Sequence, residues 1–261
     1  MEKCSIFVIS HKEFKCPISD ILLPIQVGKC NTGLCLDYLQ DDIGDNISSK
    51  NSNYCELTAM YWAWKNYECD IIGICHYRRF FINTIFRKDF ISKRKLLKDL
   101  QNYDMLLRYP TPHFETNEQW FVKTSGKQKD MDLLKKVVSE LFPEYLQSLD
   151  KVLNSNSASY CNMMICRKNI YNAYCEWLFA ILFEMEKHID LKNYSQYEAR
   201  IFGFIAELLL NVFVEKNSMK VCYYPVDEIN NLRDNKAKHF IRTNCITKRI
   251  YDKYYTKKYM N

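Results

Sequence analysis

Continuous apolar runs, separated by amphipathic stretches, recur along the chain. The first run, residues 4–10 with the sequence CSIFVIS, lacks a regular polar alternation and is typical of a strand buried on both faces. Similar runs predict strands at 24–28, 70–76, 103–107 and 160–166. Apolar residues at helical spacing predict helices over 87–100, 131–141, 171–187 and 198–214. This order indicates an α/β protein with a mostly parallel central sheet and a helical carboxyl-terminal part.

A polar, turn-rich loop at 41–48 leads into another predicted helix. Asn53, with Glu56 three residues later, has the spacing of a capping box, and apolar residues follow at helical spacing. The loop and helix start fit an anion or ribose site, or equally a simple cap followed by core packing. Because no repeat, low-complexity linker or shift in composition divides the chain, we expect one domain over residues 1–261.

Basic residues follow two of the predicted strands. The run 70–76 ends in His76 and continues to Arg78 and Arg79, and the first strand is followed by His11 and Lys12. Ligands of open α/β sheets bind outside the carboxyl ends of the strands, and guanidinium groups there suit a diphosphate. The pattern therefore favours a phosphorylated, nucleotide-linked substrate, although solvated arginines that merely close a strand would give the same local sequence.

Composition limits the possible partners. The chain has 48% apolar and 15% aromatic residues, which indicates a folded globular protein. Its net charge of +6 favours acidic partners such as nucleotides or an anionic membrane, but falls short of a nucleic-acid-binding footprint. Mixed charge along most segments also argues against a nucleic-acid stripe.

The amino terminus lacks a signal-peptide pattern, so we expect the 12 cysteines to be reduced in a cytoplasmic protein. No apolar run reaches the roughly 18 residues of a membrane span. The segment 248–259 interleaves basic and aromatic residues. It fits peripheral docking at the inner face of the plasma membrane, or equally a solvated tail.

Familiar catalytic signatures are missing from the sequence. It contains no G-x-x-x-x-G-K, G-x-G-x-x-G, H-E-x-x-H or G-x-S-x-G. This argues against hydride transfer, ATP hydrolysis and serine hydrolysis.

An ordered series of motifs resembles a known family. The segments GDNIS at 44–48, NYCELTAMYWAWKN at 53–66 and GICHYRRFF at 73–81 resemble the domain-of-unknown-function family 4422, which is associated with capsular and exopolysaccharide glycosyltransferases. The similarity continues through residues 11–12, 24–28, 160–165, 175–179 and 200–207, and so covers nearly the whole chain.

The resemblance implies a GT-A-like, Rossmann-related fold. Residues 1–110 would form the nucleotide-sugar donor half, and residues 111–261 the acceptor half with its helical carboxyl terminus. The implied activity is that of a hexosyltransferase, which moves a sugar from a nucleotide donor to a bacterial cell-surface polysaccharide, a lipopolysaccharide or a lipid-linked oligosaccharide. A UDP-linked donor, with galactose as the sugar, is the expectation by resemblance.

Roles can be assigned to individual residues on this basis. Glycosyl transfer requires stabilisation of the departing diphosphate and, for inversion, a base for the acceptor proton. The candidate bases are Glu207, His76 and Glu198. For Glu207, a structural ion pair with Arg200 is an equally good explanation as a catalytic role. The acceptor candidates are Asn162 and Arg200. The donor candidates are His11, Lys12, Gly28, Asp45, Asn46, Asn53, Arg78 and Arg79.

We expect transfer without a metal, with Mn²⁺ or Mg²⁺ as the open alternative. The strand end at 76–78 offers no carboxylate pair, and Asp130 and Asp132, although spaced as Asp-x-Asp, begin an amphipathic helix where acidic residues favour the dipole. A non-catalytic nucleotide- or glycan-binding accessory protein of a polysaccharide assembly complex is the alternative function. It would need the basic residues but no working base.

Overall fold

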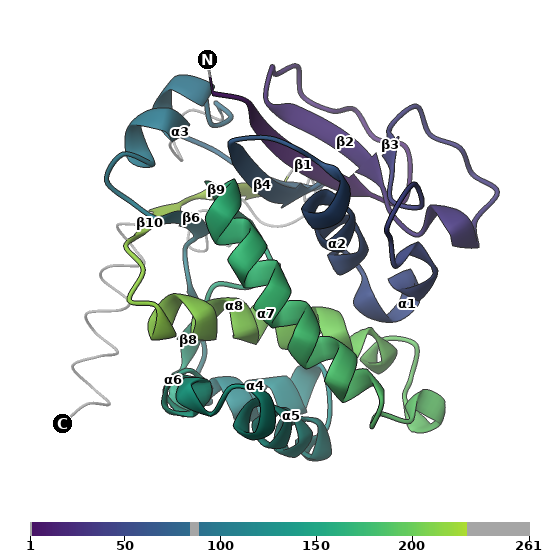
Figure 1. Ribbon diagram of the computed structural model, residues 1–261, viewed down its shortest axis with the longest axis vertical. Helices are drawn as coiled ribbons and strands as arrows, with labels where there is room; N and C mark the ends of the chain where they lie inside the picture. Colours follow the sequence, from purple (N-terminus) through teal and green to yellow (C-terminus); the bar gives the residue numbers. More distant parts are fainter. Residues whose placement is uncertain (1, 84–88, 229–261) are drawn as a thin grey trace.

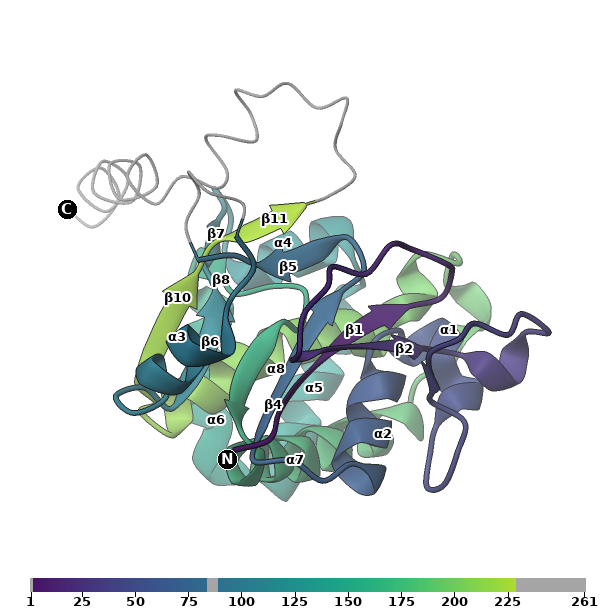
Figure 2. The same cartoon turned by 90° about the horizontal axis from the view of Figure 1, so that it is seen from above.

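A mixed, mostly parallel β-sheet forms the centre of the protein in a computed structural model that describes residues 2–83 and 89–228. Its strands follow the order β10-β6-β9-β4-β1-β2-β3, and Figure 2 shows most of them side by side. Only β9 runs antiparallel to its neighbours on this path. The bounds are β1 Cys4–Ser10, β2 Leu22–Gln26, β3 Leu39–Gln40, β4 Ile71–His76, β6 Met105–Arg108, β9 Met164–Arg167 and β10 Val221–Tyr224.

A short antiparallel extension continues the sheet beyond β4. Strand β5 (Arg79–Phe81) pairs with β4 through His76 and Arg79, so Tyr77 and Arg78 form a two-residue turn between them. On its other side β5 pairs with β11 (Val226–Glu228). A separate two-stranded sheet joins β7 (Thr111–Pro112) to β8 (Ser157–Ala158). The hairpin places Arg78 at the tip and Arg79 on a strand.

Helices cover both faces of the sheet (Figure 1). On one side of the sheet lie α1 Asn51–Tyr54, α2 Leu57–Asn66, α7 Lys168–Glu186 and α8 Ile201–Lys216, and on the other lies α3 Lys93–Asp99. Beyond α7 and α8, farther from the sheet, pack α4 Asn117–Thr124, α5 Gln128–Leu141 and α6 Leu146–Asn154. All seven residues of β1 are buried, and alternate side chains enter different cores: Phe7 packs with the large helical layer and Ile6 with the α3 side. A strand covered on both sides needs an uninterrupted apolar sequence, which is why β1 carries one.

The expected α/β class, with a mostly parallel central sheet and a helical carboxyl-terminal part, is confirmed. Strands from both proposed halves of the chain share one sheet, because β9 and β10 lie beside β4 and β6. Within the described ranges, no helix is long and apolar enough to cross a membrane. The segment 248–259, predicted to dock on a membrane, lies outside the described residues.

Three local predictions were wrong. The predicted strand 160–166 begins only at Met164, because Cys161 and Asn162 adopt positive φ angles of 72° and 49°. The predicted helix 87–100 is limited to α3 in the described residues.

The capping box of Asn53 and Glu56 does not form either. Asn53 lies inside α1, and Cys55, at φ 52° and ψ −126°, breaks the chain direction before α2. The Asn53 amide Nδ2 instead donates to the Ala199 carbonyl at 2.8 Å, which ties α1 to the segment before α8.

Candidate active site

Basic side chains gather where β1 and β4 end. The two strands are parallel neighbours with Ile9 opposite His76, so the residues that follow them emerge at the same sheet edge. Lys12 Nζ lies 5.3 Å from the centroid of the Tyr77 ring, and Arg78 Cζ lies 5.0 Å from it. The His11 ring meets Tyr77 edge-on at 5.6 Å. The structure therefore brings His11, Lys12 and Arg78 together around one aromatic ring.

Arg200 joins this basic group from the far end of the sequence. Burial lowers the pKa of His11, and the charges of Lys12, Arg78 and Arg200 lower it further. The Arg200 guanidinium is held by a hydrogen bond from Nε to Cys55 Sγ at 3.1 Å and by the ring of Phe204. Among the described residues, no carboxylate lies in ion-pair contact with Lys12, Arg78 or Arg200. The positive charge of Lys12 and Arg78, which no described carboxylate pairs, suits an anionic ligand. Arg200 differs, because burial lowers its pKa but its hydrogen bond to Cys55 and the charge of Glu56 raise it by more.

The turn at Cys161 and Asn162 connects three elements next to this basic group. His76 Nε2, at the end of β4, donates to the Cys161 carbonyl at 2.7 Å. The Cys161 N–H donates to Glu207 Oε1 of α8 at 2.7 Å. Asn162 Nδ2 donates to Glu56 Oε1, at the start of α2, at 2.7 Å. The left-handed conformation of both turn residues allows neighbouring positions to serve two different carboxylates.

Glu207 carries the most unusual carboxylate of this turn. Burial and the charge of Glu56 raise the pKa of Glu207 to about 7, against the opposing effects of the Cys161 N–H, Arg108 and Arg79. Burial lowers the pKa of His76, aided by Arg79 and Arg108 and opposed by Glu56 and by the Cys161 carbonyl. At neutral pH Glu207 is thus divided between its two protonation states, and His76 is neutral. A carboxylate with a pKa near the working pH is suited to proton transfer.

The two adjacent arginines serve different surroundings. Arg78 is exposed at the hairpin tip against Tyr77, whereas Arg79 lies on β5 and acts on His76 and Glu207 through its charge. Arg108, at the end of β6, donates from Nη1 to Cys161 Sγ at 2.9 Å. The geometry therefore separates an exposed basic group around Tyr77 from a second one, Arg79 with Arg108, beside the carboxylates.

Gly28 lies in a loop that one buried carboxylate organises. Its N–H donates to Asp41 Oδ2 at 2.9 Å, and Asp41 also accepts from the Lys29 N–H and from the hydroxyls of Ser48 and Thr58. Gly28 adopts φ 64°, a left-handed conformation that favours glycine. A predicted donor residue is therefore fixed by Asp41, which the sequence analysis had placed only in a polar loop.

The remaining predicted site residues hold loops in place. Asp45 Oδ1 accepts from the Tyr61 hydroxyl at 3.1 Å. The Asn46 side chain donates to the Asp42 carbonyl and accepts from the Ser48 N–H, both at 3.1 Å. Glu198 Oε2 accepts from the Ser195 N–H at 2.8 Å, and this contact and the Ser195 hydroxyl lower the Glu198 pKa. A carboxylate with a lowered pKa is a weaker base than Glu207.

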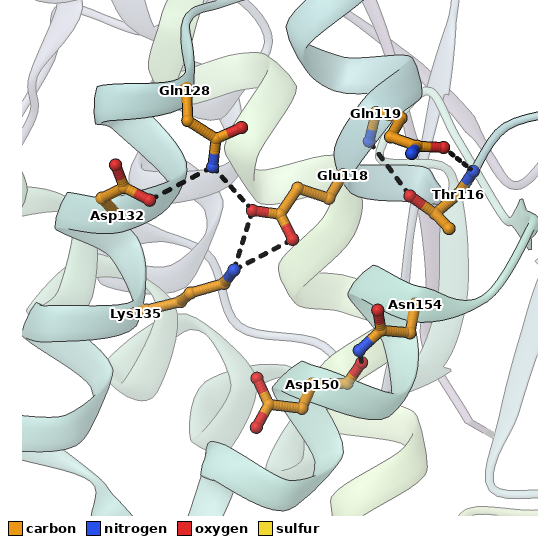
Figure 3. Close-up of polar contacts among 8 residues, drawn as sticks. All are labelled: Thr116, Glu118, Gln119, Gln128, Asp132, Lys135, Asp150 and Asn154. Atoms are coloured by element: carbon orange, nitrogen blue, oxygen red, sulfur yellow. Dashed lines mark hydrogen bonds and ion pairs between the residues drawn. The ribbon is translucent and has the colours of Figure 1, made fainter.

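Asp130 and Asp132 lie on α5 and have partners there. Asp130 Oδ2 accepts from the Lys127 N–H at 2.7 Å, as a helix cap. Asp132 turns toward Gln128, whose Nε2 donates to it at 3.1 Å, in the network that Figure 3 shows with Glu118 and Lys135. In residues 2–83 and 89–228, no group of three or more His, Cys, Asp or Glu side chains is arranged to hold a metal ion.

The sequence pattern does not predict a functional role for two residues of the site, Glu56 and Arg108. Glu56 had the spacing of a helix cap, so its long-range contact with Asn162 was hidden. Arg108 is the last residue of β6, as His76 is the last residue of β4, so the rule applied to β1 and β4 could have found it.

Comparisons with solved structures find similarity to glycosyltransferases. The apo structure of the WbbM bifunctional glycosyltransferase matches with a TM-score of 0.82 and 30% identity, over 88% of this chain and 46% of that one. The chain thus spans about half the length of that relative. The mannosyltransferase Ktr4p from S. cerevisiae matches with a TM-score of 0.40 and 11% identity, over 95% of this chain and 72% of that one. No curated protein matches.

A family model covers most of the described fold. It is the model for the "Domain of unknown function (DUF4422)", and it matches residues 5–218, from the second residue of β1 to just beyond α8. The match confirms the resemblance carried by the motifs at 44–48, 53–66 and 73–81. The chain belongs to the DUF4422 family.

Proposed function

We propose that the protein is a glycosyltransferase that uses a nucleotide-sugar donor. The observation that carries the proposal is the basic group of Lys12, Arg78 and Arg200 around His11, at the sheet edge where His76 links β4 to the turn that holds Glu207. The pKa of Glu207 is raised to about 7. One side of such a site can hold a departing diphosphate while the other takes up a proton. The similarity to part of the WbbM bifunctional glycosyltransferase supports this reading.

Donor and acceptor would approach the site from two directions. Lys12, Arg78 and His11 would bind the diphosphate, with Arg79 adding positive charge nearby. Gly28, Asp45, Asn46 and Asn53 would shape the nucleoside side, the last three through the loops that they hold. Asn162 and Arg200 would face the acceptor. His11, Lys12 and Arg78 follow the ends of β1 and β4, where α/β proteins place their ligands.

Glu207 is the proposed base. Its carboxylate would accept the proton of the acceptor hydroxyl as that oxygen bonds to the anomeric carbon and the bond from this carbon to the phosphate oxygen breaks. His76, neutral and donating to the Cys161 carbonyl, would hold the turn that orients Glu207. Glu198 is the less suitable base because its carboxylate caps a turn.

The finer assignments rest on the family resemblance. We propose a GT-A-like hexosyltransferase with a UDP-linked donor, galactose as the sugar, and a cell-surface glycan or lipid-linked acceptor met at the inner face of the membrane. Transfer would proceed without a metal. The alternative, a non-catalytic nucleotide- or glycan-binding accessory protein, uses the same basic group but gives no role to the raised pKa of Glu207.

Nucleotide binding is the first test. Thermal shift and calorimetry with UDP, GDP and their sugars, each with and without Mn²⁺ or Mg²⁺, should find one nucleotide that binds without metal. In the variant Lys12→Ala/Arg78→Ala we expect binding to weaken by about 100-fold, since charge-assisted hydrogen bonds contribute about 1.5–3 kcal/mol each. Lys135→Ala is the matched control, because Lys135 of α5 is paired with Glu118 of α4. Failure of every nucleotide to bind the folded protein would contradict the proposal.

Turnover separates the enzyme from the accessory protein. A bound nucleotide sugar should be consumed when oligosaccharide or lipid-linked acceptors are supplied, with a labelled product as the readout. Tight donor binding without transfer to any acceptor, together with unchanged binding in Glu207→Gln, would favour the accessory protein.

A further inference from the structure

We propose that Glu56 is a positioning residue of this site, whose carboxylate orients the Asn162 amide and whose negative charge controls how readily Glu207 takes up a proton. The inference rests on the proposed transfer function, but the effect of the Glu56 charge on Glu207 can be tested without any substrate. Glu56 lies at the N-cap of α2, yet its side chain caps no backbone N–H of that helix. Glu56 Oε1 instead accepts a hydrogen bond from Asn162 Nδ2, 106 residues away.

The backbone before Glu56 is held in an unusual conformation. Cys55, at φ 52° and ψ −126°, is a residue with a Cβ in a region that L-residues rarely occupy. Several contacts fix it: its N–H donates to the Asn51 carbonyl, its own carbonyl accepts from Asn51 Nδ2, and its thiol accepts from Arg200. The turn at Cys55 ends α1 and directs the next residue, Glu56, toward the 161–162 turn. Strained residues of this kind concentrate at functional sites.

Glu56 and Gly203 together determine the orientation of the Asn162 amide. Nδ2 donates to Glu56 Oε1 at 2.7 Å and to the Gly203 carbonyl at 3.1 Å. A carbonyl oxygen can only accept, so the atom facing Gly203 must be the NH₂ group. Both amide hydrogens are thereby used. The other atom, Oδ1, is a fully buried acceptor that has no hydrogen-bond partner among the described residues. A buried acceptor without a partner is costly, and points to a water or ligand hydroxyl as its partner.

The charge of Glu56 acts on several groups that surround it. It opposes ionisation of Glu207 and favours the charged form of His76. The other charged or titratable groups that face Glu207 are His76 of β4, Arg79 of β5, Arg108 of β6, Tyr160 and Cys161 of the turn, and Cys55 between α1 and α2. Arg79 and Arg108 favour the ionised Glu207, and Glu56 is the one carboxylate that opposes them in this set.

Two variants separate the two roles of Glu56. Glu56→Gln keeps an oxygen that can accept from Asn162 but removes the charge. Glu56→Asp keeps the charge but shortens the side chain, so the hydrogen bond to Asn162 should be lost. Glu184→Gln is the matched control, since Glu184 lies on the surface paired with Lys187. Circular dichroism and thermal unfolding establish that each variant is folded.

The readout is the titration of the Glu207 carboxyl carbon by NMR, assigned with Glu207→Gln. In Glu56→Gln we expect the midpoint to fall from about 7 by on the order of one pH unit. Glu56→Asp should move it less, and Glu184→Gln should leave it unchanged. If the substrate turns over, the pH profile of kcat should move with the midpoint in Glu56→Gln. In Glu56→Asp, KM for the acceptor should rise at an unchanged pH profile.

An unchanged Glu207 midpoint in folded Glu56→Gln would overturn the charge role. An acceptor KM in Glu56→Asp equal to that of the wild type would overturn the orienting role. A shifted midpoint in a protein that binds no nucleotide would retain the coupling of Glu56 and Glu207 and reject the transfer function, so the two failures are distinguishable.

Discussion

Two carboxylates near α2 have opposite surroundings. Asp41 is buried and accepts four hydrogen bonds, from two backbone N–H groups and two hydroxyls. Glu207 accepts one from the Cys161 N–H and shares its surroundings with a second carboxylate, Glu56. The first region satisfies its charge completely with short-range partners. The second leaves its charge poorly compensated, although Arg79 and Arg108 are close by.

This difference indicates a structural role for Asp41 and a chemical role for Glu207. A buried ion that is surrounded by donors fixes the loops which supply them, as Asp41 fixes the Gly28 and Ser48 loops. A buried carboxylate with few donors and a like charge beside it takes up a proton near neutral pH. The following experiments test whether the two regions differ in this way.

Removal of Asp41 should have the largest effect on stability. In Asp41→Ala four donors lose their acceptor, and each unsatisfied buried group costs about 1–3 kcal/mol, so we expect a loss of about 3 kcal/mol or more. Urea unfolding measures it. Asp45→Ala removes an exposed carboxylate with one hydroxyl partner and should cost under about 1 kcal/mol. Equal losses in the two variants would show that the four buried donors of Asp41 contribute no more than the one exposed contact of Asp45.

Replacement of Glu207 should affect turnover more than folding. In Glu207→Gln we expect kcat to fall by about 100-fold or more, the usual contribution of a positioned base. The pKa of Glu207 is raised to about 7 in the folded protein, so the folded state binds its proton more tightly than the unfolded chain does. Its contribution to stability is therefore present below the ordinary pKa and is lost as pH rises to about 7.

The pH dependence of unfolding measures this sign. The melting temperature of Glu207→Gln, relative to that of the wild type, should increase from about pH 5 to about pH 7 and then stay level. A difference that is constant across this range would show that Glu207 titrates normally.

A backbone change in the Asp41 region should have an intermediate effect. A Cβ at Gly28 would lie 2.7 Å from Asn51 Oδ1, at a φ of +64°. We expect Gly28→Ala to lose about 1–2 kcal/mol, the cost of a left-handed conformation for an L-residue. Gly33→Ala is the control, since no atom lies within 4 Å of its Cβ position. A neutral Gly28→Ala would mean that the loop adapts, and that Asp41 does not fix it.

Removal of a surface ion pair should have the smallest effect on stability. Lys135 reaches both oxygens of Glu118, at 2.7 and 2.9 Å, between α4 and α5 (Figure 3). Lys135→Ala should cost no more than about 1 kcal/mol, measured by thermal unfolding, because partly exposed pairs contribute little. A loss as large as that of Asp41→Ala would contradict this ranking.

Periodicity predicted most elements because their causes are local. The run 4–10 coincides with β1, and α7 begins three residues before and ends one residue before the helix predicted over 171–187. The basic strand ends followed from the same reasoning, since parallel strands bring their ends to one edge. These predictions needed no knowledge of which segments meet in space.

The turns around Glu207 were beyond this reasoning. Cys55 and Cys161 adopt positive φ angles that their residue type disfavours, so only tertiary contacts explain them. The partners of Asn162 and Glu207 lie 106 and 46 residues away in the sequence. A capping-box spacing at Asn53 and Glu56 fitted the local rule, yet both side chains have long-range partners instead. Local rules describe contacts between neighbours along the chain, whereas contacts between residues distant in sequence determine the conformation of these turns.

The hydrogen bond between Glu207 of α8 and the 161–162 turn can form only late in synthesis, because α8 lies near the end of the described chain. His11, Lys12 and Arg78 leave the ribosome early, whereas Arg200 and Glu207 follow more than a hundred residues later. A nascent chain thus possesses the groups proposed to hold an anion well before the carboxylate proposed to take up a proton. The residues proposed to bind the ligand and the residue proposed to take up a proton are therefore synthesised at separate times, since Glu207 lies on α8, the last helix among the described residues.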